Sequence, residues 1–242
     1  MENKTYPQTS DFALVNEGLR QHLMKVFNFM AGGLTITALV AYICLNTPLI
    51  GLFFSVNGQS VSLSALGWLF FLAPLFMVFA FSWIVNKGTA KQVQGMFWGY
   101  SAVMGIALSP ILLVYTGESI ARVFLITAAT FGAMSLYGYT TKRDLSRMGS
   151  FLIMALFGII IAGFVNMFMK SSAMSYALSI LSVLIFTGLT AYDIQKIRDL
   201  YVDYDYDDGE TMTKKAVCGA LELYLDFINI FISLLRLLGE RK

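Results

Sequence analysis

Residues 216–238 read AVCGALELYLDFINIFISLLRLL, and this stretch decides the fold class of the chain. About 20 mostly apolar residues suffice to cross a bilayer as a helix, and this segment is slightly longer. Three ionisable side chains nevertheless lie within it: Glu222, Asp226 and Arg236. Ionisable residues inside a span are costly to place there and mark a functional path or site. The segment is therefore predicted to be a transmembrane helix with one polar side.

The polar residues of this segment share that side of the predicted helix. At 100° per residue they fall within about 100° of arc; they are Gly219, Glu222, Asp226, Asn229, Ser233 and Arg236. A polar stripe along a whole span cannot face lipid, so it must face protein or water. Two interpretations follow. The stripe either lines an ion path, with Glu222, Asn229, Ser233 and Arg236 along the pore, or forms a buried polar seam between helices.

Composition places the rest of the chain in the membrane as well. Of 242 residues, 57% are apolar and only 13% are charged, whereas a soluble domain carries about 25% charged residues. Seven segments are long and apolar enough to span a bilayer, at residues 26–45, 65–85, 96–115, 120–139, 150–169, 176–195 and 216–238. We predict an all-α polytopic membrane protein with seven transmembrane helices. The net charge of only +2 argues against a nucleic-acid partner.

The charge distribution predicts the domain organisation and the orientation. Residues 1–25 are expected to form a cytoplasmic N-terminal segment, with a short amphipathic helix on the membrane surface over residues 11–25. Residues 26–242 are expected to form a single seven-helix membrane domain. Lys and Arg concentrate in the N-terminal segment and in alternate loops, and such loops stay in the cytoplasm. The C-terminus is then predicted to lie outside.

Small residues and prolines predict how the helices meet and bend. Small side chains four residues apart let helix backbones approach closely, and three such pairs occur, at Ala128/Gly132, Ala129/Ala133 and Gly158/Ala162. Pro74 and Pro110 lie inside two spans and predict kinks there. Cys44 and Cys218 fall at opposite sides of the membrane, so they are not expected to form a disulfide.

A second buried carboxylate is predicted in the span before the last one. Asp193 lies on a polar face of span 176–195, and consecutive antiparallel spans are usually neighbours. Asp193 and Asp226 are therefore expected to meet. Two buried carboxylates at close range cannot both ionise cheaply, so they would share a proton. Once deprotonated, the same pair offers hard oxygen ligands for Ca²⁺ or another cation. No cofactor is predicted, and two cysteines and one histidine do not supply a zinc site.

The linker between these two spans carries an acidic run, DYDYDDGE, at residues 203–210. Alternating aspartates resemble an EF-hand loop, but the position that requires Gly is Asp208 and the position that requires Glu is Lys214. The run is interpreted as a solvated loop or as an electrostatic funnel that concentrates cations near the inner mouth.

Three motifs resemble the Bax inhibitor-1 family of transmembrane proteins, and its bacterial branch most of all. They are FGAMSLYGYTTKRDLS at residues 131–146, TGLTAYDIQ at 187–195 and GALELYLDFINIFISLLRLLG at 219–239. The resemblance implies six helices around a central seventh, an inner-membrane location in a bacterium and a pH-sensitive Ca²⁺ leak. It also implies that the functional aspartate pair of the family corresponds to Asp193 and Asp226.

The chain departs from the family pattern at one place. The resemblance implies an arginine on the second helix that latches the aspartates, but residues 65–85 contain no basic residue. Either Lys87, Lys196 or Arg236 takes that role, or this protein closes by protonation of the pair rather than by an ion pair.

Two other functional classes compete with a cation leak. Presenilin-like proteases also use two intramembrane aspartates. Tyr192–Asp193 matches the first of their motifs, but residues 223–226 read LYLD and lack the glycines of the second, so no enzymatic activity is predicted. The other alternative is a regulator that binds membrane proteases or other quality-control partners through the N-terminal segment or the linker at 196–215.

Overall fold

The computed structural model describes residues 9–48, 50–57, 60–203 and 209–242. Within these residues the elements are α1 (Thr9–Asn46), α2 (Ile50–Phe53), β1 (Phe54–Asn57), β2 (Ser60–Leu63), α3 (Ala65–Lys87), α4 (Ala90–Val114), α5 (Gly117–Thr140), α6 (Ser146–Met169), α7 (Ser172–Asp203) and α8 (Gly209–Leu238). All the helices except the four-residue α2 are long and apolar enough to cross a membrane. The prediction of an all-α polytopic protein with seven transmembrane helices is confirmed.

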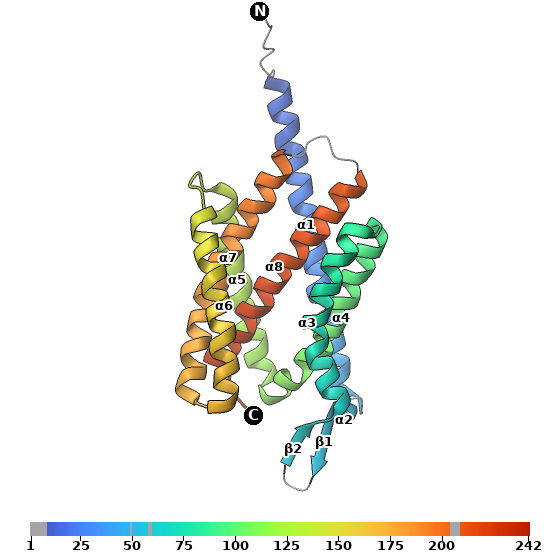
Figure 1. The fold of residues 1–242 in the computed structure, drawn as a ribbon, viewed down its shortest axis with the longest axis vertical. Helices are drawn as coiled ribbons and strands as arrows, with labels where there is room; N and C mark the ends of the chain where they lie inside the picture. Colours follow the sequence, from blue (N-terminus) through green and yellow to red (C-terminus); the bar gives the residue numbers. More distant parts are fainter. Residues whose placement is uncertain (1–8, 49, 58–59, 204–208) are drawn as a thin grey trace, which may run out of the picture.

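The last helix, α8, occupies the centre of the bundle (Figure 1). It packs against α1, α4, α5 and α7. In the most apolar window of each span, 67% of the residues of α8 are buried, whereas no other span exceeds 33%. The two remaining spans lie outside, with α3 packed against α4 and α6 packed against α7. The expected arrangement of six helices around a central seventh is therefore confirmed, with α3 and α6 as its outermost members.

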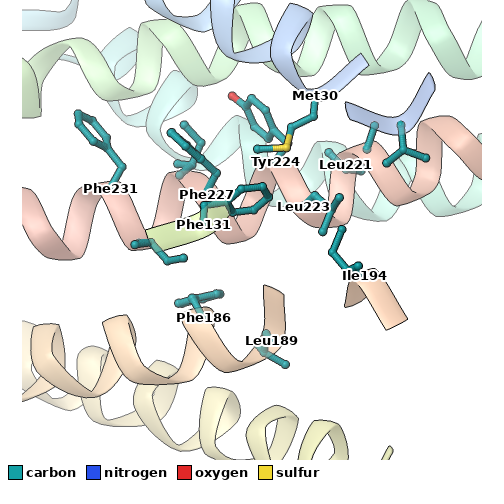
Figure 2. Packing of buried hydrophobic residues seen from close by; sticks show 14 of the residues in the cluster. Met30, Phe131, Phe186, Leu189, Ile194, Leu221, Leu223, Tyr224, Phe227 and Phe231 are labelled. Atoms are coloured by element: carbon teal, nitrogen blue, oxygen red, sulfur yellow. The ribbon is translucent and has the colours of Figure 1, made fainter. Parts of the chain in front are cut away.

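Aromatic side chains of α8 fix its position in the core. The ring of Phe227 meets that of Phe131 from α5 edge-on, with centroids 5.6 Å apart (Figure 2). The fully buried Tyr224 points towards α1, where its hydroxyl lies 2.6 Å from Thr37 Oγ1. Thr37 Oγ1 in turn lies 2.8 Å from the carbonyl oxygen of Ser101 in α4. This chain of buried hydroxyls links α8 to α1 and α4.

Two of the sequence motifs pack directly against each other. Gly138 in α5 lies against the backbone of Ala191 in α7, so close that a Cβ atom would overlap the carbonyl group. Near the end of α7, the buried Gln195 accepts a hydrogen bond from the amide of Leu145 at 2.7 Å and donates one to the carbonyl of Arg143 at 2.8 Å. Gln195 thereby holds the α5–α6 loop, where α6 begins without a side-chain cap.

The last residues of the chain fasten the end of α8 to the α4–α5 turn. The amide of Thr116 donates to the carbonyl of Glu240 at 3.0 Å, and the amide of Lys242 donates to the carbonyl of Val114 at 2.9 Å. We call residues 239–242 the C-terminal strap. It lies at the opposite end of the bundle from the first turns of α1 (Figure 1).

The N-terminal prediction is wrong in one respect. Residues 11–25 do not form a separate surface helix, because α1 runs without interruption from Thr9 to Asn46. No proline occurs between residues 8 and 47 to end it. Leu19, His22 and Leu23 are buried, so this part of α1 packs against the bundle rather than lying on a membrane surface.

The small-residue pairs are also wrong as predictors of helix contact. Gly132 and Gly158 are exposed, and no atom lies within 4 Å of the place that a Cβ would take. Close approaches occur instead at other glycines, for example at Gly138 and at Gly149, which faces the ring of Tyr192. Spacing identifies small residues that share a face, but it does not say whether that face is turned to protein or to lipid.

The structure also bears on the hairpin, the prolines, the cysteines and the acidic run. The β1–β2 hairpin, paired antiparallel, was not predicted. Pro74 and Pro110 lie inside α3 and α4. Cys44 and Cys218 are free, as expected. Residues 204–208 of the acidic run lie outside the described residues, so its interpretation as a loop or funnel stays a prediction.

The contact at Gly138 can be tested with a matched pair of substitutions in α5. Gly138→Ala should lower the free energy of unfolding by about 1–3 kcal/mol, because the new methyl group overlaps the backbone of Ala191. Gly132→Ala adds the same methyl group to open space and should be neutral or slightly stabilising. Thermal unfolding of both variants in detergent measures the difference. Equal melting temperatures would contradict the close packing of α5 on α7.

Candidate functional site

The most unusual group in the membrane part of the structure is the carboxyl group of Asp226. Asp226 lies in the middle of the central helix α8 and is only 4% exposed. Its Oδ2 atom is buried and has no hydrogen-bond partner among the described residues. A buried oxygen of this kind carries the full cost of desolvation unless a proton, a cation or water compensates it.

Asp193 of α7 is the neighbour that the sequence predicted. It is half-buried, and its carboxyl group interacts electrostatically with that of Asp226. The buried hydroxyl residue Thr190, one turn earlier in α7, also lies beside Asp226. The structure therefore brings Asp193 and Asp226 together near the middle of α8.

A third carboxylate and a lysine complete the group. Lys196 Nζ lies 2.7 Å from Glu222 Oε1 and forms an ion pair with it, with both side chains more than one third exposed. Lys196 also interacts electrostatically with Asp193, and Glu222 with both aspartates. We call Asp193, Glu222 and Asp226, together with Lys196, the acid cluster. It contains three carboxylates and one cation.

Of the three basic residues considered as latches, Lys196 alone belongs to this cluster. Lys87 lies over the ring of Trp83, 5.4 Å from its centroid, at the end of α3. Arg236 follows Asp226 by ten residues, which is about 15 Å along a helix. The cation beside the aspartates is thus on the same helix as Asp193, rather than on the second transmembrane helix.

The acid cluster opens onto a cavity of about 830 Å³ that follows α8. We call this cavity the lateral groove. Its walls come from α3 and α4 on one side and from α6 and α7 on the other, with α8 as its floor. Its walls are mostly apolar, and its polar lining residues on α8 are Glu222, Asp226, Asn229 and Arg236.

The predicted polar stripe lies partly in this groove. Glu222, Asn229 and Arg236 line it, whereas Ser233 is buried and does not. The open side of α8 is centred on Asn229 and Arg236 together with Leu225 and Ile232, which fall within about 60° of arc. Ser233 lies outside that arc. The stripe is therefore offset from the open side of the helix, where the apolar residues Leu225 and Ile232 lie beside it.

The cluster is not a preformed metal cage. Within the described ranges, no three His, Cys, Asp or Glu side chains are grouped so that they could hold a metal ion. Ca²⁺ takes six to eight oxygen ligands. Asp193 and Asp226 could thus supply only part of a coordination shell, with the remaining ligands coming from water.

Sequence reasoning named Lys196 only as one of three alternatives and did not foresee its pairing with Glu222. The sequence does contain a signal for this pairing. Lys196 follows Asp193 by three residues and Glu222 precedes Asp226 by four, so each lies on the same helix face as its aspartate. Placing the two aspartates together also places Lys196 near Glu222.

Comparison with known proteins gives a consistent assignment. The family described as inhibitor of apoptosis-promoting Bax1 matches residues 19–242. The inner membrane protein YbhL of Escherichia coli is 41% identical over 237 residues, covering 98% of this chain and 99% of its own. Protein RP147 of Rickettsia prowazekii is 41% identical, with 99% and 98% covered, and a protein of Borreliella burgdorferi is 47% identical, with 91% and 92% covered. The chain therefore belongs to the Bax inhibitor-1 family.

Proposed function

We propose that this protein is a leak channel or exchanger for Ca²⁺ or another cation, gated by protonation of Asp193 and Asp226. The observation that carries the proposal is the buried, unpartnered carboxylate oxygen of Asp226 beside a second carboxylate. An ionisable group at this depth in a membrane helix is costly and is retained where function needs it. No enzymatic step is proposed.

Proton exchange at the pair supplies the gating principle. In the closed state the two carboxylates share a proton, because two adjacent charges in a dry site repel each other strongly. When the proton leaves at higher pH, the repulsion favours a state in which water and a cation enter. Ca²⁺ then contacts Asp193 and Asp226 with water as its further ligands.

Lys196 also stabilises the closed state. Its ion pair with Glu222 and its interaction with Asp193 partly neutralise the acid cluster. The cluster still contains more carboxylates than cations, so a proton remains necessary. Closure in this protein therefore depends on the proton first and on Lys196 second.

The proposed location is the bacterial inner membrane, as in the name of YbhL. Following the distribution of Lys and Arg, we propose a cytoplasmic N-terminus and an external C-terminus. The competing role, a regulator that acts only by binding membrane-protein partners, makes a different prediction for purified protein. Such a protein passes no ion on its own.

Purified protein in liposomes separates these functions. A calcium-sensitive dye inside the vesicles should report Ca²⁺ entry that grows as the external pH rises. Empty liposomes and liposomes with Asp193→Asn/Asp226→Asn protein serve as controls. An absence of flux at every pH would overturn the transport proposal and favour the binding role.

The aspartates should act as one unit. Asp193→Asn and Asp226→Asn each mimic the proton-bound form, so each should flatten the rise of Ca²⁺ flux with pH. The double variant should resemble the more severe single variant, because coupled sites are not additive. Flux against pH in liposomes measures all three. Two independent effects that add would show that the aspartates do not share a site.

Lys196 should set the pH at which flux begins. Removing its positive charge in Lys196→Met favours retention of the proton, so the flux curve should move to higher pH by about one unit. Lys196→Arg keeps the charge and should behave nearly as the parent protein. Lys87→Met, remote from the cluster, serves as control. A Lys196→Met protein that conducts at every pH would instead make Lys196 the latch and would refute closure by protonation.

A further inference from the structure

The lateral groove is open towards the surrounding membrane. On its two rims, α3 packs against α4 and α6 against α7, and neither rim covers the other. Lining residues on both rims are exposed: Phe71 by 52% and Leu75 by 57% on α3, and Ile160 by 57% on α6. In a bilayer these side chains contact acyl chains, so the groove lies in the path of lipid rather than of bulk water.

The length of the groove matches one leaflet. From Asp226 to Arg236 the floor of the groove extends about 15 Å along α8. The hydrocarbon core of a bilayer is about 30 Å thick, so this distance is half of it. Over this stretch the residues of α8 that line the groove are Asn229, Ile232 and the two end residues. Between the acid cluster and Arg236 the groove is thus mostly apolar, with Asn229 as the one polar residue that α8 contributes between those two ends.

Charge distinguishes the two ends of this stretch. At the cluster end, Glu222 has its own cation in Lys196. At the other end Arg236 is exposed at the groove, and no carboxylate or hydrogen-bond acceptor among the described residues pairs with it. Neighbouring Arg122, by contrast, is paired with Glu240 at 2.7 Å. A guanidinium without a partner at the membrane boundary is complementary to a phosphate group, which it can bind through two parallel hydrogen bonds.

We propose that the lateral groove is a binding site for one phospholipid from the leaflet at the C-terminal end of α8. The phosphate binds Arg236, and one acyl chain lies along Ile232 and Asn229 and ends below Asp226. This chain completes the wall that α3 and α6 leave open, and it excludes water from the lower half of the groove. The site is a binding property of its own and does not depend on the proposed cation flux.

The test uses phosphatidylglycerol with a photoactivatable diazirine in the middle of one acyl chain. The protein is reconstituted in phosphatidylcholine vesicles that contain a small fraction of this probe, and cross-linked residues are mapped by mass spectrometry. Cross-links should concentrate on groove residues such as Ile232 and Leu75 rather than on the outward face of α6. Even labelling around the bundle would show an ordinary lipid annulus and would overturn the proposal.

Matched variants distinguish binding of the phosphate by Arg236 from entry of the acyl chain into the groove. Arg236→Gln should reduce groove cross-links about tenfold, as expected for loss of a charge-assisted contact, whereas Arg236→Lys should keep most of them. Arg241→Gln removes a basic residue of the strap outside the groove and should change nothing. Ala107→Phe fills the groove and should abolish labelling there, while Ala129→Phe on the exposed face of α5 should not.

Two results would refute this site. Groove labelling that survives Arg236→Gln unchanged would show that no phosphate anchor exists. Disulfide cross-linking between copies of a Leu75→Cys variant, with loss of lipid labelling, would assign the groove to an interface between two chains. Thermal unfolding of each variant confirms that the measured protein is folded.

Discussion

Burial of Asp226 is the constraint on which the rest of this structure depends. The helix that carries it is the one on which the bundle is built, so this carboxyl group cannot be moved to water without opening the core. Its cost must be met locally, and the structure places Asp193 and Thr190 beside it. Both partners come from α7, the helix that packs most closely on α8. Stability and titration are thereby coupled in one pair of helices.

The surroundings of α8 differ from side to side. Towards α1, α4 and α5, the helix is held by aromatic rings and by the hydroxyl chain through Tyr224 and Thr37. Towards the gap between α3 and α6 it has mostly apolar walls, and no helix among the described residues covers it. The acid cluster lies where these two environments meet. Proton exchange there changes the balance between a firmly packed side and a side that lipid or water can occupy.

Sequence alone predicted much of this arrangement, because the deciding features are local. The length of the spans, the polar side of α8 and the adjacency of two consecutive helices require no knowledge of distant contacts, and they place Asp193 beside Asp226. What could not be predicted depends on which way a face is turned. Ser233 belongs to the same polar arc as Glu222 but is covered, and Gly132 has the right spacing for a contact but faces outward. Periodicity specifies an angle on a helix and leaves the neighbour at that angle undetermined.

The C-terminal strap limits how α8 can move. Backbone hydrogen bonds from Thr116 to Glu240 and from Lys242 to Val114 tie the end of the helix to the α4–α5 turn. A helix pinned at one end cannot slide along its axis like a piston, but it can tilt about the pinned end. Displacement in such a tilt grows with distance from the pivot, so it is small at Arg236 and larger at Asp226 and Glu222. The strap therefore places the pivot of any such tilt at the Arg236 end of α8 and the carboxylates on the longer arm.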